Sequence, residues 1–252
     1  DESTAGPRLR RTLDWPFPGL GRLLEVALQR GPAGEFLNVT WPGFAGVLTA
    51  MAPARFAASI NQAPMRRRTN LAALLWLDYV LNAFSAICGS GRLPPEHVLR
   101  QAFETCATFD EARRLLETAP LARPVLFVLV GCHQGERVVI ERESTSARTY
   151  SDDTVIANAW RHLSDGWRPR VCGVGTPAEN NSRRMAAMFN WSGRDADDFG
   201  WAIAPVLNAK TRLTVEMCPV AGTLKVAGWE DDERGSAEPV TAFTTLSESM
   251  IS

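Results

Sequence analysis

Arg11 and Asp14 are the first residues of the chain whose types and spacing could support chemistry. They lie in a segment, Leu9 to Phe17, whose alternation of apolar and polar residues is typical of a strand. On a strand, Arg11 shares one face with Leu13, whereas Asp14 shares the other face with Thr12. Charges beside a core-forming strand need partners, because burying them without partners is costly. The two residues are therefore either a structural ion pair or part of a functional site.

Cys132 is a second candidate, since it follows the apolar segment 124–130 and precedes His133. A thiol beside an imidazole would suggest a cysteine nucleophile. Adjacent residues on a strand point to opposite faces, however, so His133 is badly placed to act as its base. We favour a hairpin turn that contains a cysteine, and Cys132 stays open as an alternative nucleophile.

Other classes of site lack their motifs. The 3 histidines are far apart and no Cys-x-x-Cys occurs, so we expect no metal site and no cofactor. The glycine-containing turns at 89–91 and 173–175 lack the lysine and the third glycine that phosphate-binding loops need. A Gly-x-Ser-x-Gly elbow, which a serine hydrolase would need, is also absent.

The elements that must position these residues follow from periodicity and from Gly and Pro. Short apolar segments predict strands at 8–15, 23–29, 35–41, 46–50, 56–61, 124–130, 137–142, 212–218 and 223–229. Helices are predicted at 71–88, from 94, from 108, at 176–189 and at 195–204. Strands, then helices, then strands indicate an α+β fold in which helices pack on sheets.

Two segments have a special character. Residues 71–88 are the most apolar stretch, but Asp78 and Asn82 interrupt it, so we expect a buried amphipathic helix and no membrane span. Residues 230–252 are acidic and Ser-rich, so we expect a mobile tail.

Composition restricts the function classes. A net charge of −1 and a pI near 6.4 argue against a general nucleic-acid or membrane-surface binder. The hydrophobic fraction of 45% is typical of one soluble domain spanning residues 1–252. Lys occurs only at Lys210 and Lys225, and this Arg-rich, Ala-rich composition is typical of a GC-rich bacterial genome. We expect a cytoplasmic location.

Five motifs, taken in order, match one family. They are Arg11-Thr12-Leu13-Asp14, residues 43–51 with 56–61, the hairpin 126–141 that closes on a Glu, residues 155–158, and residues 181–184. Together they resemble motifs of the cysteine N-terminal-nucleophile hydrolases, a group of linear amide hydrolases that includes isopenicillin-N acyltransferase, acid ceramidase and choloylglycine hydrolase. The resemblance spans residues 8–229 and implies the four-layer αββα sandwich of that family.

The resemblance also implies a mechanism. In this family the nucleophile is an N-terminal cysteine exposed by autoproteolysis, and its α-amino group acts as the base. Asp14 would then hold the α-amino group, Arg11 would lower the pKa of the thiol, and Arg183 would orient the Asp14 neighbourhood or the amine. Asn61 and Asn158 would form the oxyanion hole. Attack on the amide releases the amine and leaves a thioester, which water or another amine resolves.

The chain departs from the family pattern at two places. The family places the nucleophile roughly sixteen residues before the position of Arg11, which is about five residues upstream of Asp1, so we expect a cysteine there. The family's Thr-Asn motif is replaced by Ala157-Asn158.

The predicted function is hydrolysis, or acyl transfer, of a linear amide with an apolar acyl chain. Trp15, Phe17, Trp41 and Phe44 would line the acyl pocket if they cluster near the nucleophile, and core packing is the alternative. The expected partners are the acyl amide substrate, a cleaved upstream propeptide and a second copy in a homo-oligomer, but no nucleic acid. The alternative function is that of a catalytically inactive protein with the same fold, which binds a small ligand or partner.

Overall fold

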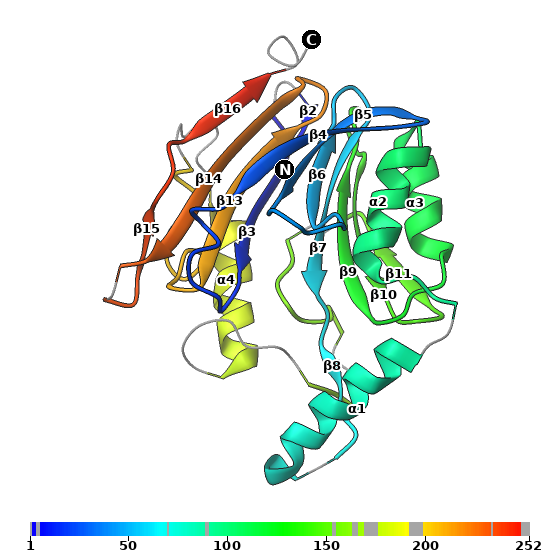
Figure 1. Cartoon of the computed structure of the whole chain (residues 1–252), viewed down its shortest axis with the longest axis vertical. Helices are drawn as coiled ribbons and strands as arrows, with labels where there is room; N and C mark the ends of the chain where they lie inside the picture. Colours follow the sequence, from blue (N-terminus) through cyan, green and yellow to red (C-terminus); the bar gives the residue numbers. More distant parts are fainter. Residues whose placement is uncertain are drawn as a thin grey trace.

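The computed structural model of the chain consists of two stacked sheets with helices on both outer faces (Figure 1). It describes residues 2–3, 6–69, 71–88, 91–152, 155–162, 166–168, 176–191, 199–232 and 234–247. These four layers, helix, sheet, sheet and helix, are the αββα arrangement that the family resemblance implies.

The larger sheet has seven antiparallel strands in the order β11-β10-β9-β7-β6-β5-β4. In chain order these strands are β4 (Glu25–Gly31), β5 (Gly34–Thr40), β6 (Thr49–Ala52), β7 (Phe56–Gln62), β9 (Val125–Val130), β10 (Arg137–Arg142) and β11 (Ala147–Tyr150). β7 and β9 lie at its centre, and both are nearly continuous apolar runs because the sheet is covered on both faces.

The smaller sheet has five antiparallel strands and joins the two ends of the chain. Its strands are β3 (Leu9–Asp14), β13 (Thr211–Cys218), β14 (Thr223–Asp231), β15 (Ala237–Pro239) and β16 (Thr244–Ser247). β3 pairs with β13, and this pairing brings Thr211 opposite Asp14. Two further pairs are short, β1 (Glu2–Ser3) with β2 (Gly6–Pro7) and β8 (Met65–Arg66) with β12 (Trp167–Arg168).

The helices begin where the sequence predicts. They are η1 (Ala72–Leu74), α1 (Leu75–Cys88), α2 (Pro95–Thr105), α3 (Phe109–Thr118) and α4 (Pro177–Asn190). The hydroxyls of Thr108 and Thr176 accept hydrogen bonds from the third residues of α3 and α4, as N-caps do. None of the helices in the described part of the chain has the length and hydropathy that a membrane span requires.

Three clusters of buried side chains hold the layers together. The first lies between α2, α3 and the larger sheet and includes Phe36, Phe56, Phe103, Leu116 and Phe127. The second lies between the sheets and includes Leu9, Leu13, Leu37, Met51 and Val215. In the third, Met188 of α4 and Trp201 pack against Trp229 of β14, so α4 covers the outer face of the smaller sheet.

The expectation of a buried helix at 71–88 is wrong. Trp76 and Phe84 of α1 are 62% and 63% exposed, whereas Asp78 is fully buried. The polar side of the helix faces the protein because Asp78 accepts hydrogen bonds from the backbone N–H groups of Arg68 and Thr69. Sequence reasoning assumed the usual orientation, with the apolar side inward.

The C-terminal segment also differs from the expectation. Residues 237–239 and 244–247, expected in a mobile tail, form β15 and β16 and pair with β14. The turn at 173–175, most of the turn at 89–91, and residues 195–198 of the expected helix 195–204 lie outside the described residues. Residues 199–204, the rest of that expected helix, form turns and no helix.

Candidate active site

β3 presents its residues alternately to two sides. Leu9, Arg11 and Leu13 are buried between the sheets, whereas the residues between them are half-buried on the side of α4. This confirms the strand that the alternation of residues 9–14 predicts.

Asp14 is held by three donors. Its side chain is only 3% exposed, and the guanidinium of Arg184 lies 2.8 Å from Oδ2. The Thr211 hydroxyl donates to Oδ1 at 2.9 Å, and the Asn208 amide donates to Oδ2 at 3.1 Å. Three donors fix the carboxylate in one orientation.

Arg11 has a different set of partners. Its guanidinium donates to the backbone carbonyl of Leu48, to the Thr49 hydroxyl, and to the carbonyl of Ile60 at 2.5 Å. Burial lowers the pKa of Arg11 to about 9, and the nearby Asp14 carboxylate acts in the opposite direction. Arg11 therefore ties β3 of the smaller sheet to β6 and β7 of the larger sheet.

The structure brings the segments of Asn61 and Asn158 together. Asn61 lies near the end of β7, directly after the Ile60 carbonyl that Arg11 binds, and it lines a cavity. The Asn158 side chain donates to the backbone carbonyl of Gln62 at 3.0 Å, which places Asn158 beside the same strand end.

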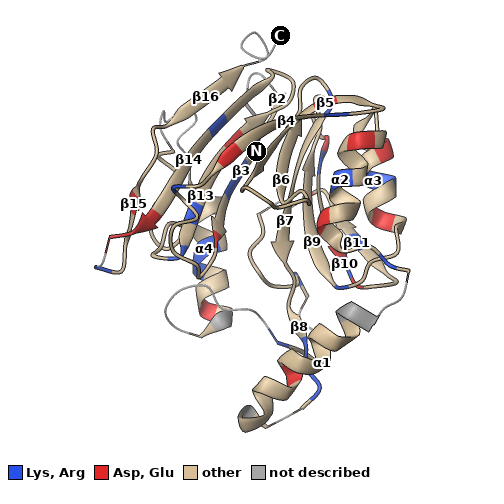
Figure 2. Ribbon diagram, viewed as in Figure 1, with Lys and Arg blue, Asp and Glu red and all other residues tan. Residues whose placement is uncertain are grey.

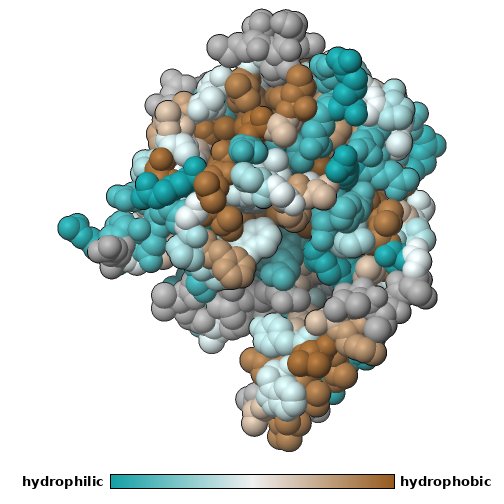
Figure 3. All heavy atoms as spheres, viewed as in Figure 1, coloured by the Kyte–Doolittle hydropathy of each residue, from teal (hydrophilic) through white to brown (hydrophobic). Residues whose placement is uncertain are grey.

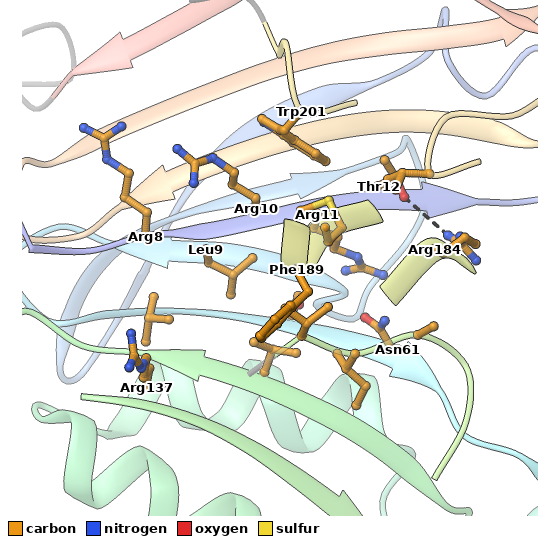
Figure 4. A pocket seen from close by; sticks show the side chains of 18 of the residues that line it. Arg8, Leu9, Arg10, Arg11, Thr12, Asn61, Arg137, Arg184, Phe189 and Trp201 are labelled. Atoms are coloured by element: carbon orange, nitrogen blue, oxygen red, sulfur yellow. Dashed lines mark hydrogen bonds between the residues drawn. The ribbon is translucent and has the colours of Figure 1, made fainter. Parts of the chain in front are cut away.

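The fifth predicted catalytic residue is Arg183, but its neighbour Arg184 makes the expected contact. Arg183 is exposed on α4, and the next residue, Arg184, makes the contact with Asp14 and lies 3.5 Å from the Thr12 hydroxyl (Figure 4). The expectation that Arg183 reaches the Asp14 neighbourhood is thus corrected to Arg184. The rotation of α4 about its axis determines whether Arg183 or Arg184 faces the smaller sheet, and a sequence motif alone does not give that rotation.

The four aromatic residues expected in the acyl pocket lie elsewhere. Trp41 is buried and donates its indole N–H to the Leu20 carbonyl at 2.7 Å, and Trp15 packs edge-on against it with ring centroids 5.9 Å apart. Phe17 is 60% exposed, and Phe44 is half-buried beside Gly46. None of these four is among the residues that line the cavity, so core or surface packing explains them.

A cavity of about 350 Å³ follows the strand β3. Five consecutive residues of β3 and its approach line it, from Arg8 to Thr12. Arg8, Arg10 and Trp201 lie on one side of the β3 ribbon, and Asn61 and Arg137 lie on the other (Figure 4). Within the described residues β3 pairs only with β13, so the cavity passes around the unpaired edge of β3.

The lining of the cavity combines apolar side chains with hydrogen-bond donors. The apolar residues are Leu9, Val128, Val130, Ile156, Met188, Phe189, Trp191 and Trp201. The indole N–H of Trp201 and two guanidinium N–H groups of Arg184 are buried, and they have no hydrogen-bond partner in the described structure. Buried donors without partners favour a ligand that carries acceptor oxygens.

Cys132 does not have the surroundings of an activated thiol. Its thiol donates to the Arg55 carbonyl at 3.6 Å, and burial raises its pKa, as does the carboxylate of Glu136. Glu136 also accepts hydrogen bonds from the backbone N–H groups of Cys132 and His133, which closes the turn between β9 and β10. The hairpin turn is confirmed, and a raised pKa opposes nucleophilic activation. No metal-binding group of His, Cys, Asp or Glu occurs among the described residues.

Sequence reasoning missed three site residues: Arg184, Asn208 and Thr211. Asn208 and Thr211 form one turn, in which the Thr211 hydroxyl accepts from the Asn208 backbone N–H. This turn precedes the final hairpin, and only the pairing of β13 with β3 brings it to Asp14.

Sequence comparison finds distant relatives of the chain. No protein-family model matches the chain. Acid ceramidase of Heterocephalus glaber is 28% identical over 120 residues, which are 48% of this chain and 28% of that protein. The N-acylethanolamine-hydrolyzing acid amidase of Cavia porcellus is 24% identical over 164 residues, 63% of this chain and 43% of that protein. The chain thus matches less than half the length of these curated relatives.

Solved structures show the same fold. The Caenorhabditis elegans ortholog of N-acylethanolamine-hydrolyzing acid amidase has a TM-score of 0.62 at 19% identity, covering 87% of this chain and 91% of its own. A variant of the conjugated bile acid hydrolase of Clostridium perfringens has a TM-score of 0.50 at 12% identity, covering 95% and 89%. The resemblance to the N-terminal-nucleophile hydrolases and the α+β sandwich are confirmed. The curated relatives are animal proteins, so a bacterial origin stays a prediction.

Proposed function

We propose that the protein cleaves a linear carbon–nitrogen amide bond, by hydrolysis or acyl transfer, through a thioester on an N-terminal cysteine upstream of Asp1. The observation that carries the proposal is the triply held Asp14 carboxylate beside a cavity that also contains Asn61. This is the grouping that such a mechanism needs: an anion for the α-amino group of the nucleophile and neutral donors for the oxyanion.

The unpaired edge of β3 suits the expected nucleophile strand. In the short hairpin before β3, Glu2 lies opposite Pro7 and Ser3 opposite Gly6. A strand that continued this register upstream would run antiparallel along the edge of β3 that β13 leaves open. In that register the position roughly sixteen residues before Arg11 falls opposite Asp14. The expected cysteine and its α-amino group would then lie beside the carboxylate proposed to hold them.

The proposed mechanism begins at the thiol of the N-terminal cysteine. The thiolate sulfur attacks the amide carbonyl carbon, and the α-amino group accepts the thiol proton and passes it to the leaving nitrogen as the C–N bond breaks. Asp14 orients that α-amino group, and Arg184 with Thr211 fixes Asp14. Asn61 and Asn158 donate to the oxyanion, and water or an amine then cleaves the thioester.

The proposed role of Arg11 differs from the one that the family resemblance implies. Its donors bind backbone carbonyls between the sheets, including that of Ile60, the residue before Asn61. We therefore assign Arg11 to positioning the Asn61 end of β7.

The cavity supports a substrate with an apolar acyl chain. Its apolar lining would contact that chain, and the unpartnered donors of Arg184 and Trp201 would face substrate oxygens. We keep three further predictions, which the contacts of the cavity do not bear on. They are the release of an upstream propeptide, self-association of the protein and a cytoplasmic location.

The test uses the protein with its upstream residues. Intact-mass analysis should give a mature chain that begins with cysteine, and an acyl 4-nitroanilide should give a burst of about one nitroaniline per chain. Asn61→Ala should lower kcat about 10²–10³-fold. The control variant Cys132→Ser should keep the burst, and a thiol-reactive reagent should still label its N-terminal cysteine.

Two results would contradict the proposal. A protein with no cysteine upstream and no burst would support the ligand-binding alternative. Loss of the burst in Cys132→Ser, with an unchanged fold, would move the nucleophile to Cys132.

A further inference from the structure

Helix α1 has its polar side inward and its apolar side outward. Asn82 donates its side-chain N–H to the Arg66 carbonyl at 2.8 Å, and Asp78 accepts from the backbone of residues 68 and 69. The Arg168 guanidinium lies 3.6 Å from Asp78 Oδ2. These contacts fix the orientation of the helix, because turning its apolar side inward would leave the buried Asp78 without partners.

The outward side is a wide apolar surface. Its large exposed side chains are Trp76, Tyr79, Val80, Leu81 and Phe84. At about 100° per residue these positions cover an arc of about 200° around the helix. A stripe that packs against one protein element is narrower, about 100° wide or somewhat more. The breadth of this surface therefore favours a fluid apolar phase as the partner.

The position of α1 leaves this surface accessible. The helix projects at one end of the molecule, away from both sheets (Figure 1), and apolar side chains gather on this projection, beside paler and more polar ones, in the space-filling view (Figure 3). Exposed apolar patches of this kind mark sites of association with proteins or membranes.

Positive charge lies beside the apolar surface. Arg66, Arg67 and Arg68 are consecutive and exposed, and basic residues lie next to α1 in Figure 2. Arg66 also lies 3.6 Å from Glu143. The one acidic residue of α1, Asp78, is buried, so the exposed side of the helix carries no negative charge. The overall charge of −1, which argues against a general membrane-surface binder, conceals this local asymmetry.

We propose that α1 docks on the surface of an anionic lipid bilayer. The helix lies in the interface, its Trp76, Val80 and Phe84 side chains enter the acyl boundary, and Arg67 and Arg68 contact lipid headgroups. Apolar burial and attraction to anionic lipids act together, as they do for interfacial helices. This role is separate from the proposed amide cleavage, since α1 contributes no residue that lines the cavity.

Co-sedimentation of the full protein with vesicles tests the proposal. One set is phosphatidylcholine alone, and the other contains about one third phosphatidylglycerol. We expect the unmodified protein to bind the anionic vesicles more strongly than the phosphatidylcholine vesicles. The double variant Trp76→Ser with Phe84→Ser should bind the anionic vesicles at least about tenfold more weakly. The double variant Arg67→Gln with Arg68→Gln should also bind them more weakly, and high salt should weaken binding of the unmodified protein in the same way. Leu28→Ser with Val220→Ser, at residues 48% and 44% exposed elsewhere, is the matched control and should bind normally.

Each of three results would overturn the proposal. Binding of the Trp76 and Phe84 double variant as strong as that of the unmodified protein would exclude the apolar side of α1 as the docking surface. Equal binding of the unmodified protein to both vesicle types would exclude an anionic bilayer as the partner. A protein that is dimeric without vesicles, and monomeric in the double variant, would identify a second copy as the partner. Circular dichroism of each variant checks that the fold is kept.

Discussion

An ion pair between Arg184 and Asp14 connects α4 to β3. The two side chains are 11% and 3% exposed, so each depends on the other for compensation of its charge. Removing one partner of a buried pair leaves an uncompensated charge, which is costly.

Arg184→Met should lower the free energy of unfolding by about 3–5 kcal/mol and reduce kcat, because Asp14 loses its charged donor. Arg183→Met, at the exposed neighbouring position, is the matched control and should change stability by no more than about 0.5 kcal/mol. Urea unfolding and burst kinetics measure both effects. Equal losses in the two variants would contradict the assignment to Arg184.

Glu141 is a carboxylate that the fold keeps in a costly environment. Burial raises its pKa above the ordinary value of 4.5, although the Arg161 backbone N–H donates to it at 2.5 Å. The folded state therefore holds the proton to a higher pH than the unfolded state does. Stability from this group is present below pH 4.5 and is lost as the pH rises through the folded pKa.

Glu141→Gln should remove that pH dependence, because the amide keeps an acceptor oxygen and has no charge to bury. Relative to the unmodified protein, the variant should gain stability as the pH is raised from about 4.5 to 7. Urea unfolding at several pH values measures the difference. Glu143→Gln, at a more exposed carboxylate, is the control, and its difference in unfolding free energy from the unmodified protein should change little with pH. If that difference did not change with pH for Glu141→Gln either, this result would refute the argument.

At the scale of elements, local signals predict the strands and helices well. β3, β4, β5 and β7 lie within one or two residues of their predicted ranges, because Gly and Pro divide them. The orientation of α1 was not predictable in this way, since periodicity shows that a helix has two sides and leaves open which side faces the protein. Asp78 faces inward only because the backbone of residues 68 and 69 needs an acceptor there.

The cap of α3 is a local feature with a measurable contribution. The Thr108 hydroxyl accepts from the Glu111 backbone N–H at 3.2 Å, and the Glu111 carboxylate accepts from the Ala107 N–H at 2.7 Å. Thr108→Ala should cost about 1 kcal/mol of unfolding free energy without affecting catalysis. Thr105→Ala, at the end of α2, is the control and should lower the free energy of unfolding by less than Thr108→Ala does. A stability unchanged by Thr108→Ala in urea unfolding would show that the cap does not contribute.

At the scale of the whole molecule, the candidate site depends on pairings between distant parts of the chain. Arg11 and Asp14 were identified from sequence, but their partners Ile60, Arg184 and Thr211 come from three other elements. Pairing of β3 with β13 joins strands from opposite ends of the chain, and no local pattern specifies that pairing. The aromatic residues expected in the acyl pocket fail for the same reason, since they would line it only if the fold clustered them near the nucleophile, and the type of a side chain does not place it in the cavity.

The space between the sheets should set the length of the acyl chain. Val128 lies at the centre of β9, lines the cavity and packs against the cluster between the sheets. Val128→Phe should fill part of the cavity and shift the preference toward shorter acyl chains, whereas Val128→Ala should extend it toward longer ones. Each methylene gained or lost should change kcat/KM about 10-fold or more for the affected chain length. A series of acyl 4-nitroanilides of increasing length measures this preference. If both variants kept the unmodified protein's profile while folding normally, the acyl chain would have to bind on the α4 side of β3.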